Sequence, residues 1–248
     1  MDDVPADLGP VVAVSTGTYH TCAIRADGQL ICFGLEDYGR CEVPEDLGPV
    51  QAVSANLYHT CAVRTDGQLV CFGGHLPGHS DVPADMGPVL AVSAGRHHTC
   101  AVKTDGQLVC FGSGSQGNLN VPANLGPVMA VSVGTRHACA VMTDGKLVCF
   151  GLDDDGKCDV PEDLGPVLTV SAGAYHTCAV KTSFQLICFG RNDAGQCDVP
   201  SDVGPVVAVS AGVHHTCAVR MDGRLVCFGS EEYGRCDVPG DVQPATSA

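Results

Sequence analysis

The sequence contains no tryptophan, and aromatic residues make up only 5% of its 248 residues. Lys and Arg are also scarce, at 13 against 28 Asp and Glu, which gives a net charge of −15. A nucleic-acid-binding surface needs clustered Lys and Arg, so the composition argues against nucleic acid as a partner.

No apolar run approaches the length of a membrane-spanning helix, which argues against a membrane protein. The start, Met1-Asp2-Asp3-Val4-Pro5, lacks the basic and apolar regions of a signal peptide. We therefore expect a cytoplasmic protein, with an extracellular location left open.

Glycine and proline are abundant, at 31 and 15 residues, which is typical of many short strands joined by turns. A 39-residue period organises them, because a His-Thr-Cys or His-Ala-Cys tripeptide recurs at this spacing. The tripeptides begin at His20, His59, His98, His137, His176 and His215. The repeats run 4–42, 43–81, 82–120, 121–159, 160–198 and 199–237. They predict one domain over 4–237, followed by residues 238–248 as a C-terminal tail or a truncated seventh unit.

Each repeat reads as β-structure. In the first, a Pro- and Gly-rich turn over 5–10 precedes a Val-rich segment, 11–15, with the character of a fully buried strand. Further strands are expected over 20–25 and 29–33, and residues 41–44 are a candidate for a short fourth strand. Three or four short strands in 39 residues predict an all-β fold, a β-propeller of six blades with short antiparallel strands. Such a blade cannot bury both of its faces alone and must pack on its neighbours.

The turn between the second and third strands sets their register. Ala26-Asp27-Gly28 suits a three-residue hairpin loop, which pairs Arg25 with Gln29. In the fifth repeat Ser183-Phe184 replaces Asp-Gly, so that hairpin must turn differently or be strained. Another glycine, Gly17, is replaced by Asn56 in the second repeat, and both residues favour positive φ. We therefore predict left-handed geometry at that position.

The same register brings two cysteines of each repeat face to face, within the Cα separation of a disulfide. The candidate pairs are Cys22 with Cys32, Cys61 with Cys71, Cys100 with Cys110, Cys139 with Cys149, Cys178 with Cys188 and Cys217 with Cys227. Reduced, buried core cysteines are the alternative, which a cytoplasmic location favours. A third set, Cys41, Cys158, Cys197 and Cys236, is replaced by Ser80 and Leu119 in repeats two and three, so this position is not an obligatory bridge or ligand.

The repeats over residues 4–237 contain six copies, with variations, of His-Thr-Cys-Ala-Val, of Asp-Gly-Gln-Leu-Val-Cys-Phe-Gly and of the loop that follows. In these segments they resemble the regulator of chromosome condensation repeat. The resemblance implies a propeller, of seven blades in most relatives, that works by interaction. Its members include exchange-factor and chromatin scaffolds, recruiting parts of ubiquitin ligases, a plant UV-B photoreceptor and a β-lactamase inhibitor. The repeats here carry no inserted wedge for nucleotide exchange and no tryptophan for photochemistry, which leaves a generic binding platform.

In a repeat protein, shared residues build the fold and the positions that differ face the partner. The residues just before the repeated histidine are amphipathic and vary, as at protein interfaces. We predict them as the partner-binding set: Tyr19, Tyr58, His97, Arg136, Tyr175 and His214. The loops after each Phe-Gly form a second variable set. The repeated histidine itself is interpreted as a structural hydrogen bond to a neighbouring turn, so no catalytic residue, metal site or cofactor is predicted.

These observations predict a non-catalytic protein-interaction propeller that binds another protein, for instance as the recruiting module of a larger regulatory or ubiquitin-ligase-type assembly. The alternative is a disulfide-stapled extracellular binder, such as an enzyme inhibitor or a carbohydrate-binding module. The oligomeric state stays open.

Overall fold

The computed structural model describes residues 4–74, 78–114, 117 and 119–239 of the chain. The predicted tail beyond 239, and residues 75–77, 115 and 116 of the second variable set, lie outside the described residues. Two compact units are present, Met1–Val133 and Gly134–Ala248, so the boundary falls inside the fourth repeat. That 4–237 forms a single domain stays a prediction.

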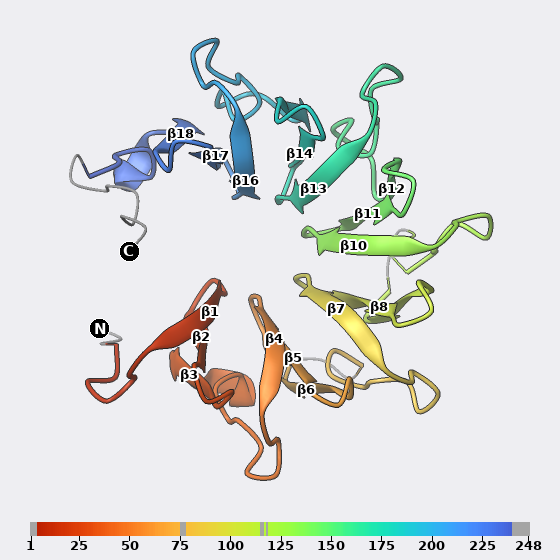
Figure 1. Cartoon of the computed structure of the whole chain (residues 1–248), viewed down its shortest axis with the longest axis vertical. Helices are drawn as coiled ribbons and strands as arrows, with labels where there is room; N and C mark the ends of the chain where they lie inside the picture. Colours follow the sequence, from red (N-terminus) through yellow and green to blue (C-terminus); the bar gives the residue numbers. More distant parts are fainter. Residues whose placement is uncertain (1–3, 75–77, 115–116, 118, 240–248) are drawn as a thin grey trace. The chain divides into compact units, whose positions relative to one another are not determined.

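Every repeat contributes three strands (Figure 1). The first strands of the repeats are β1 (Val11–Thr16), β4 (Val50–Ala55), β7 (Val89–Ala94), β10 (Val128–Val133), β13 (Val167–Ala172) and β16 (Val206–Ala211). The second strands are β2 (His20–Arg25), β5 (His59–Arg64), β8 (His98–Lys103), β11 (His137–Met142), β14 (His176–Lys181) and β17 (His215–Arg220). The third strands are β3 (Leu30–Gly34), β6 (Leu69–Gly73), β9 (Leu108–Gly112), β12 (Leu147–Gly151), β15 (Leu186–Gly190) and β18 (Leu225–Gly229). The predicted fold class is confirmed: the chain is all-β, with six propeller blades of three antiparallel strands.

The predicted hairpin register is also confirmed. Cys22 lies opposite Cys32 across β2 and β3, and the amide of Arg25 donates to the carbonyl of Gln29 at 2.9 Å. Gly28 closes the loop with a φ of 85°. Glycine adopts this left-handed geometry without the steric cost that a Cβ would bring.

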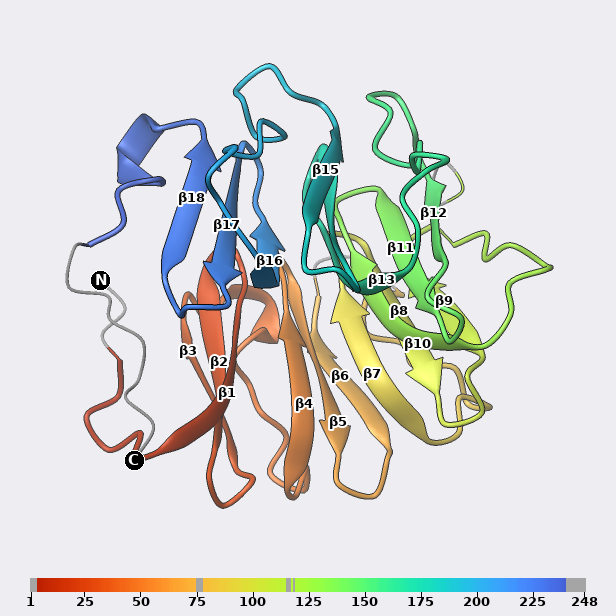
Figure 2. The same cartoon turned by 45° about the horizontal axis from the view of Figure 1, so that its top comes forward.

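The fourth strand was only a candidate, and it does not form. Residues 41–44 have no strand conformation, nor do their equivalents in the described parts of the other repeats. In each sheet the third strand is therefore an edge strand, as Figure 2 shows for β18 beside β17. Short 3₁₀ turns, η1 (Asp37–Gly39) and η2 (Glu232–Gly234), occur in the loops that follow β3 and β18.

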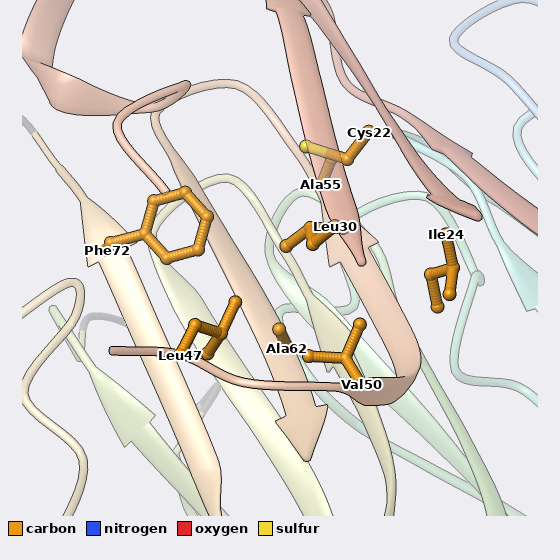
Figure 3. Close-up of a cluster of buried hydrophobic side chains, with 8 residues drawn as sticks. All are labelled: Cys22, Ile24, Leu30, Leu47, Val50, Ala55, Ala62 and Phe72. Atoms are coloured by element: carbon orange, nitrogen blue, oxygen red, sulfur yellow. The ribbon is translucent and has the colours of Figure 1, made fainter. Parts of the chain in front are cut away.

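The core of each unit lies between consecutive repeats. Figure 3 shows one such cluster, in which Leu30 of β3 meets Leu47 and Phe72 of the second repeat. The corresponding positions form a cluster between repeats two and three, and another between repeats five and six. Packing of each repeat on the next supplies the burial that a single blade lacks.

The prediction of a fully buried first strand was wrong. Val50 of β4 is 3% exposed, but the next residue, Gln51, is exposed, and the rest of the strand is mostly half-buried. In β1 even the residue equivalent to Val50, Val11, is 45% exposed. A Val-rich sequence reports strand propensity, whereas burial on both faces depends on what packs against the strand.

Candidate partner-binding surface

The repeated histidine links each repeat to the next one. His20 Nε2 lies 2.8 Å from Thr60 Oγ1, and the Thr60 hydroxyl donates to the carbonyl of Arg40 at 2.9 Å. Since this hydroxyl has one proton, Nε2 of His20 must be protonated and donate to Oγ1. The same contact recurs between His59 and Thr99, His137 and Thr177, and His176 and Thr216. The inter-repeat hydrogen bond exists as interpreted, but the acceptor is a strand threonine and not a turn.

Burial keeps these histidines neutral. Burial, followed by the charge of Arg40, lowers the pKa of His20 to about 4. Burial lowers the pKa of His59 to about 3, with a further contribution from the charges of nearby histidines. The pKa values of His98 and His176 fall to about 4, again mainly through burial. Among the described residues no group of three or more His, Cys, Asp or Glu is arranged to hold a metal ion.

The role predicted for Gly17 was wrong. Neither Gly17 nor Asn56 has a positive φ. Gly17 is needed because a Cβ at this position would collide with the backbone oxygen of Asn56 in the next repeat and lie 2.8 Å from the His20 ring. Asn56 instead donates its side-chain amide to the carbonyl of Ala94 at 2.7 Å. Close approach between repeats, rather than turn geometry, selects the small residue.

All six candidate cysteine pairs form disulfides, each with a Cα separation of 4.1 Å. The bonds join Cys22 to Cys32, Cys61 to Cys71, Cys100 to Cys110, Cys139 to Cys149, Cys178 to Cys188 and Cys217 to Cys227. The alternative of reduced core cysteines is therefore not the arrangement found. The cysteine on the second strand is buried in the first five repeats, whereas those on the third strands, Cys32, Cys71, Cys110, Cys149, Cys188 and Cys227, are half-buried. Each disulfide thus ties the middle strand of a sheet to its less protected edge strand.

The third set of cysteines, Cys41, Cys158, Cys197 and Cys236, is not disulfide-bonded. Burial, followed by the charge of Asp153, raises the pKa of Cys158 to about 12. Burial likewise raises the pKa of Cys197 to about 11. The thiols of Cys158 and Cys197 stay protonated near neutral pH, which makes them poor nucleophiles.

The two variable sets meet at one end of each sheet. The amide of Leu35, which begins the loop after β3, donates to the carbonyl of Tyr19 at 2.8 Å. The equivalent hydrogen bonds join Ser113 to His97, Leu152 to Arg136, Arg191 to Tyr175 and Ser230 to His214. We call this end the loop end, and the opposite end, with the Asp-Gly turns, the hairpin end. The predicted partner-binding residues all lie at the loop end and are exposed or half-buried.

In unit 1 the structure brings three of the predicted residues into an aromatic cluster. The rings of Tyr58 and His97 lie 5.8 Å apart, and Tyr38 packs edge-on against Tyr58 at 6.2 Å. The Arg40 guanidinium lies 5.7 Å from the ring centre of Tyr19 and 5.4 Å from that of Tyr38. Tyr19 and Tyr38 remain 53% and 51% exposed. Exposed tyrosines held by neighbouring groups are the rigid amphipathic side chains that protein interfaces favour.

In unit 2 the predicted residues form a smaller cluster. Tyr175 stacks on His214 at 5.8 Å, and the Arg191 guanidinium lies 5.1 Å from the Tyr175 ring centre. Arg136 is exposed. Tyr233, in η2, is 92% exposed and belongs to the second variable set. Both units therefore present tyrosine at the loop end, each with a nearby arginine.

Sequence reasoning missed a buried polar position in the same loops. Four described residues two positions before the end of their repeats are almost completely buried: Arg40, His79, Lys157 and Gln196. The Arg40 guanidinium donates to the carbonyls of Asp37 at 2.7 Å and Leu57 at 2.9 Å. Lys157 instead pairs with the carboxylates of Asp154 and Asp155. The available signal was that all six repeats place a long or polar side chain here.

The loops at the loop end also carry many carboxylates. Exposed acidic residues there are Glu36, Asp37, Glu42, Asp153, Asp154, Asp193, Glu231 and Glu232. The hydrogen bond from Lys157 is the main cause that lowers the pKa of Asp154. Arg40 and Lys157 are buried and Arg136 is exposed, so carboxylates outnumber the accessible cations at this end. Such a surface favours partners that bring positive charge.

Within the described residues, no helix is both long and apolar enough to cross a membrane. The fold defines a β-propeller repeat protein, whose loop end carries aromatic and acidic side chains. The model of the regulator of chromosome condensation (RCC1) repeat matches residues 11–40, 50–75, 89–118, 129–157, 167–196 and 206–235. The chain belongs to this family. No curated protein sequence matches the chain.

Solved structures share the fold. Prp20p from Saccharomyces cerevisiae, described with its binding properties to Gsp1p and histones, is 17% identical with a TM-score of 0.81; the match covers 94% of this chain and 75% of Prp20p. The ectodomain of the receptor kinase CR4 from Physcomitrella patens is 23% identical with a TM-score of 0.75, and 89% of this chain spans 62% of that ectodomain. The CRINKLY WD40 ectodomain of ACR4 from Arabidopsis thaliana is 21% identical with a TM-score of 0.73, over 91% of this chain and 83% of that one.

Proposed function

We propose that this chain is a non-catalytic protein-binding module that uses the loop end to recruit a partner protein into a larger assembly. The observation that carries the proposal is the set of exposed and half-buried tyrosines at that end, each near an arginine or a histidine. Tyr and Arg are the residues that contribute most to binding energy at interfaces, and rings held by their neighbours lose little entropy on binding.

The most symmetric residues support a binding role over catalysis. Burial lowers the pKa values of His20 and His59, their threonine partners orient the rings, and the thiols of Cys158 and Cys197 have raised pKa values. Neither group offers the activated nucleophile or poised base that a catalytic site requires. Variation between repeats is concentrated on the exposed loop end.

The proposal is tested by affinity capture with the wild-type chain and a Tyr19→Ala/Tyr58→Ala/Tyr175→Ala variant. We expect captured proteins to bind the variant roughly tenfold more weakly, as for loss of hot-spot residues. The matched control carries three alanines at exposed hairpin-end positions, Gln29→Ala/Gln68→Ala/Arg224→Ala, and should retain binding. Equal binding by all three proteins, with unfolding curves showing each to be folded, would contradict the proposal.

A second candidate, a stapled binder in an oxidising compartment, is favoured by the six disulfides. Disulfides persist outside the cytosol and are rare within it. The CR4 and ACR4 structures are receptor ectodomains, which agrees with this candidate. Thiol titration of the denatured, unreduced native protein distinguishes the two locations. We expect four titratable thiols in the oxidising case, against all 16 cysteines in the cytoplasmic one.

A further inference from the structure

The hairpin end of the fifth repeat differs from the other five. The turn after the second strand is Asp-Gly in five repeats and Ser183-Phe184 in the fifth. The structure corrects one of the two expectations for this hairpin: it does not turn differently. The Phe184 amide donates to the carbonyl of Lys181 at 2.8 Å, as Gly28 does to Arg25 at 2.9 Å. The glycine conformation is kept, so Phe184 has a φ of 64°.

Phe184 is unfavourable at this position for two reasons. A left-handed backbone brings the Cβ of an L-residue too close to its own carbonyl oxygen. The position is also crowded, because a Cβ on Gly28 or Gly145 would lie 2.9 Å from the Cβ of Pro49 or Pro166. Burial does not compensate, since Phe184 is 36% exposed. A residue that breaks local rules with no structural gain is a candidate for function.

Phe184 lines a surface groove of about 680 Å³. One wall is β15, and the other is the loop 197–205, which includes Val199, Pro200 and Pro205. Equivalent grooves in repeats one, two and four have turn carboxylates at their rims, from Asp27, Asp66 and Asp144. Among the described residues lining the fifth groove, none is charged. Of these four grooves, only the fifth-repeat groove is lined by no charged residue.

The missing carboxylate also changes its neighbour. Arg64 and Arg220 each pair with the Asp of their own turn at 3.1 Å, and Arg25 and Lys103 do so at 3.8 and 4.0 Å. Ser183 replaces that Asp in the fifth repeat, and over the described part of the chain no carboxylate pairs with Lys181. The Lys181 ammonium lies close to Gly165, in the turn before β13, and Lys181 is not among the residues that line the groove.

The groove wall β15 is an edge strand. It pairs with β14 on one side, and no other strand in the described ranges pairs with its second edge. Unpaired backbone donors and acceptors of an edge strand are a template for an added strand. Leu186 and Cys188 of this strand line the groove.

We propose that the groove between β15 and the loop 197–205 binds an extended peptide segment of a partner protein, which adds as a fourth strand to β15. Phe184 packs on an apolar residue of that peptide. This site runs along β15 from the hairpin end and includes none of the predicted partner-binding residues.

The test is selection from a display library of short random peptides on the wild-type chain. We expect enrichment of peptides with alternating apolar residues, and at least tenfold weaker binding of the same peptides to Ser183→Asp/Phe184→Gly. That variant restores the turn of the other repeats and should raise the melting temperature, so lost binding cannot result from unfolding.

A second measurement isolates strand addition. N-methylation of alternate peptide amides should abolish binding in one register and leave it unchanged in the other, because every second amide of an added strand donates to β15. Equal binding to the wild type and Ser183→Asp/Phe184→Gly overturns the proposal, and so does insensitivity to N-methylation in both registers. Failure to enrich any peptide overturns it as well. None of these results bears on the loop-end tyrosines.

Discussion

Repeats one and four each bury a cation at the same position, and they stabilise it in opposite ways. Arg40 is held by two tyrosine rings and two backbone carbonyls, whereas Lys157 is held by the carboxylates of Asp154 and Asp155. Both residues are 1% exposed. A delocalised guanidinium is weakly hydrated and stacks on rings, while a compact ammonium needs a negative partner.

Two aligned positions account for the difference. Tyr38 of repeat one corresponds to Asp155 of repeat four, and Tyr19 corresponds to Arg136. In repeat four, where the cation Arg136 takes the place of Tyr19, the carboxylate of Asp155 takes the place of the Tyr38 ring. The comparison shows that the fold buries a side chain at this position in both repeats. The groups that stabilise its charge differ, and they are supplied by the neighbouring residues of each repeat.

The largest difference between the two units is expected in how much stability each loses when the pH is lowered. Histidines with lowered pKa values bind fewer protons in the folded state than in the unfolded state, so their stability is present above pH 6.5 and is lost as the pH falls toward 4. Unit 1 has three such histidines with pKa values of about 3 to 4, His20, His59 and His98. In unit 2 the pKa of His176 is about 4, and burial also lowers the pKa of His215. Between these pH values, the contribution of each such histidine to the free energy of unfolding falls by about 1.4 kcal/mol for every unit by which the pH is lowered.

Hydrogen exchange measured by repeat at pH 7 and pH 5 checks this prediction. We expect the strands of repeats one to three to lose more protection than those of repeats five and six. Equal loss in both units would break the comparison.

The next largest effect is expected from Asp154→Asn/Asp155→Asn. This change leaves the Lys157 ammonium buried without a negative partner, at a cost of about 3 kcal/mol in the free energy of unfolding. The loss should be seen at neutral pH. It should shrink as the pH falls through the lowered pKa of Asp154, because the wild-type ion pair is itself lost there. Denaturant unfolding at pH 7 and at pH 3 measures both.

The smallest effect is expected from the matched change in repeat one, Asp37→Asn. Asp37 aligns with Asp154, but Arg40 uses its backbone carbonyl, which asparagine retains. The free energy of unfolding should change by less than about 0.5 kcal/mol. A loss as large as that of the repeat-four variant would show that Arg40 depends on this carboxylate, against the ring-held arrangement.

Much of the fold could be predicted from local sequence. Asp27-Gly28 determines the loop length, the loop length determines the register, and the register places Cys22 opposite Cys32. The repeated histidine was identified as a structural group because catalytic residues rarely recur in every repeat. The loop end was found from the positions at which the repeats differ.

The predictions that were wrong or missing concern positions whose environment is set by contacts between repeats. The requirement at Gly17 arises from an oxygen in the next repeat, 39 residues away, and local turn preferences carry no signal of it. The burial of Arg40 arises in the same way, from rings and carbonyls on either side of it. Strand burial and the acceptor of His20 also depend on the neighbouring repeat, so sequence reasoning within one repeat is limited at these positions.

The disulfides have a mechanical consequence. Each joins residues 10 apart within one hairpin, and none in the described residues joins one repeat to another. Under tension the chain can lengthen between hairpins but not through them. The 39-residue period less the 10-residue separation leaves 29 residues per repeat to extend, roughly 100 Å at about 3.5 Å per residue. Each repeat can therefore lengthen by the same amount under tension, and its disulfide sets the limit of that extension.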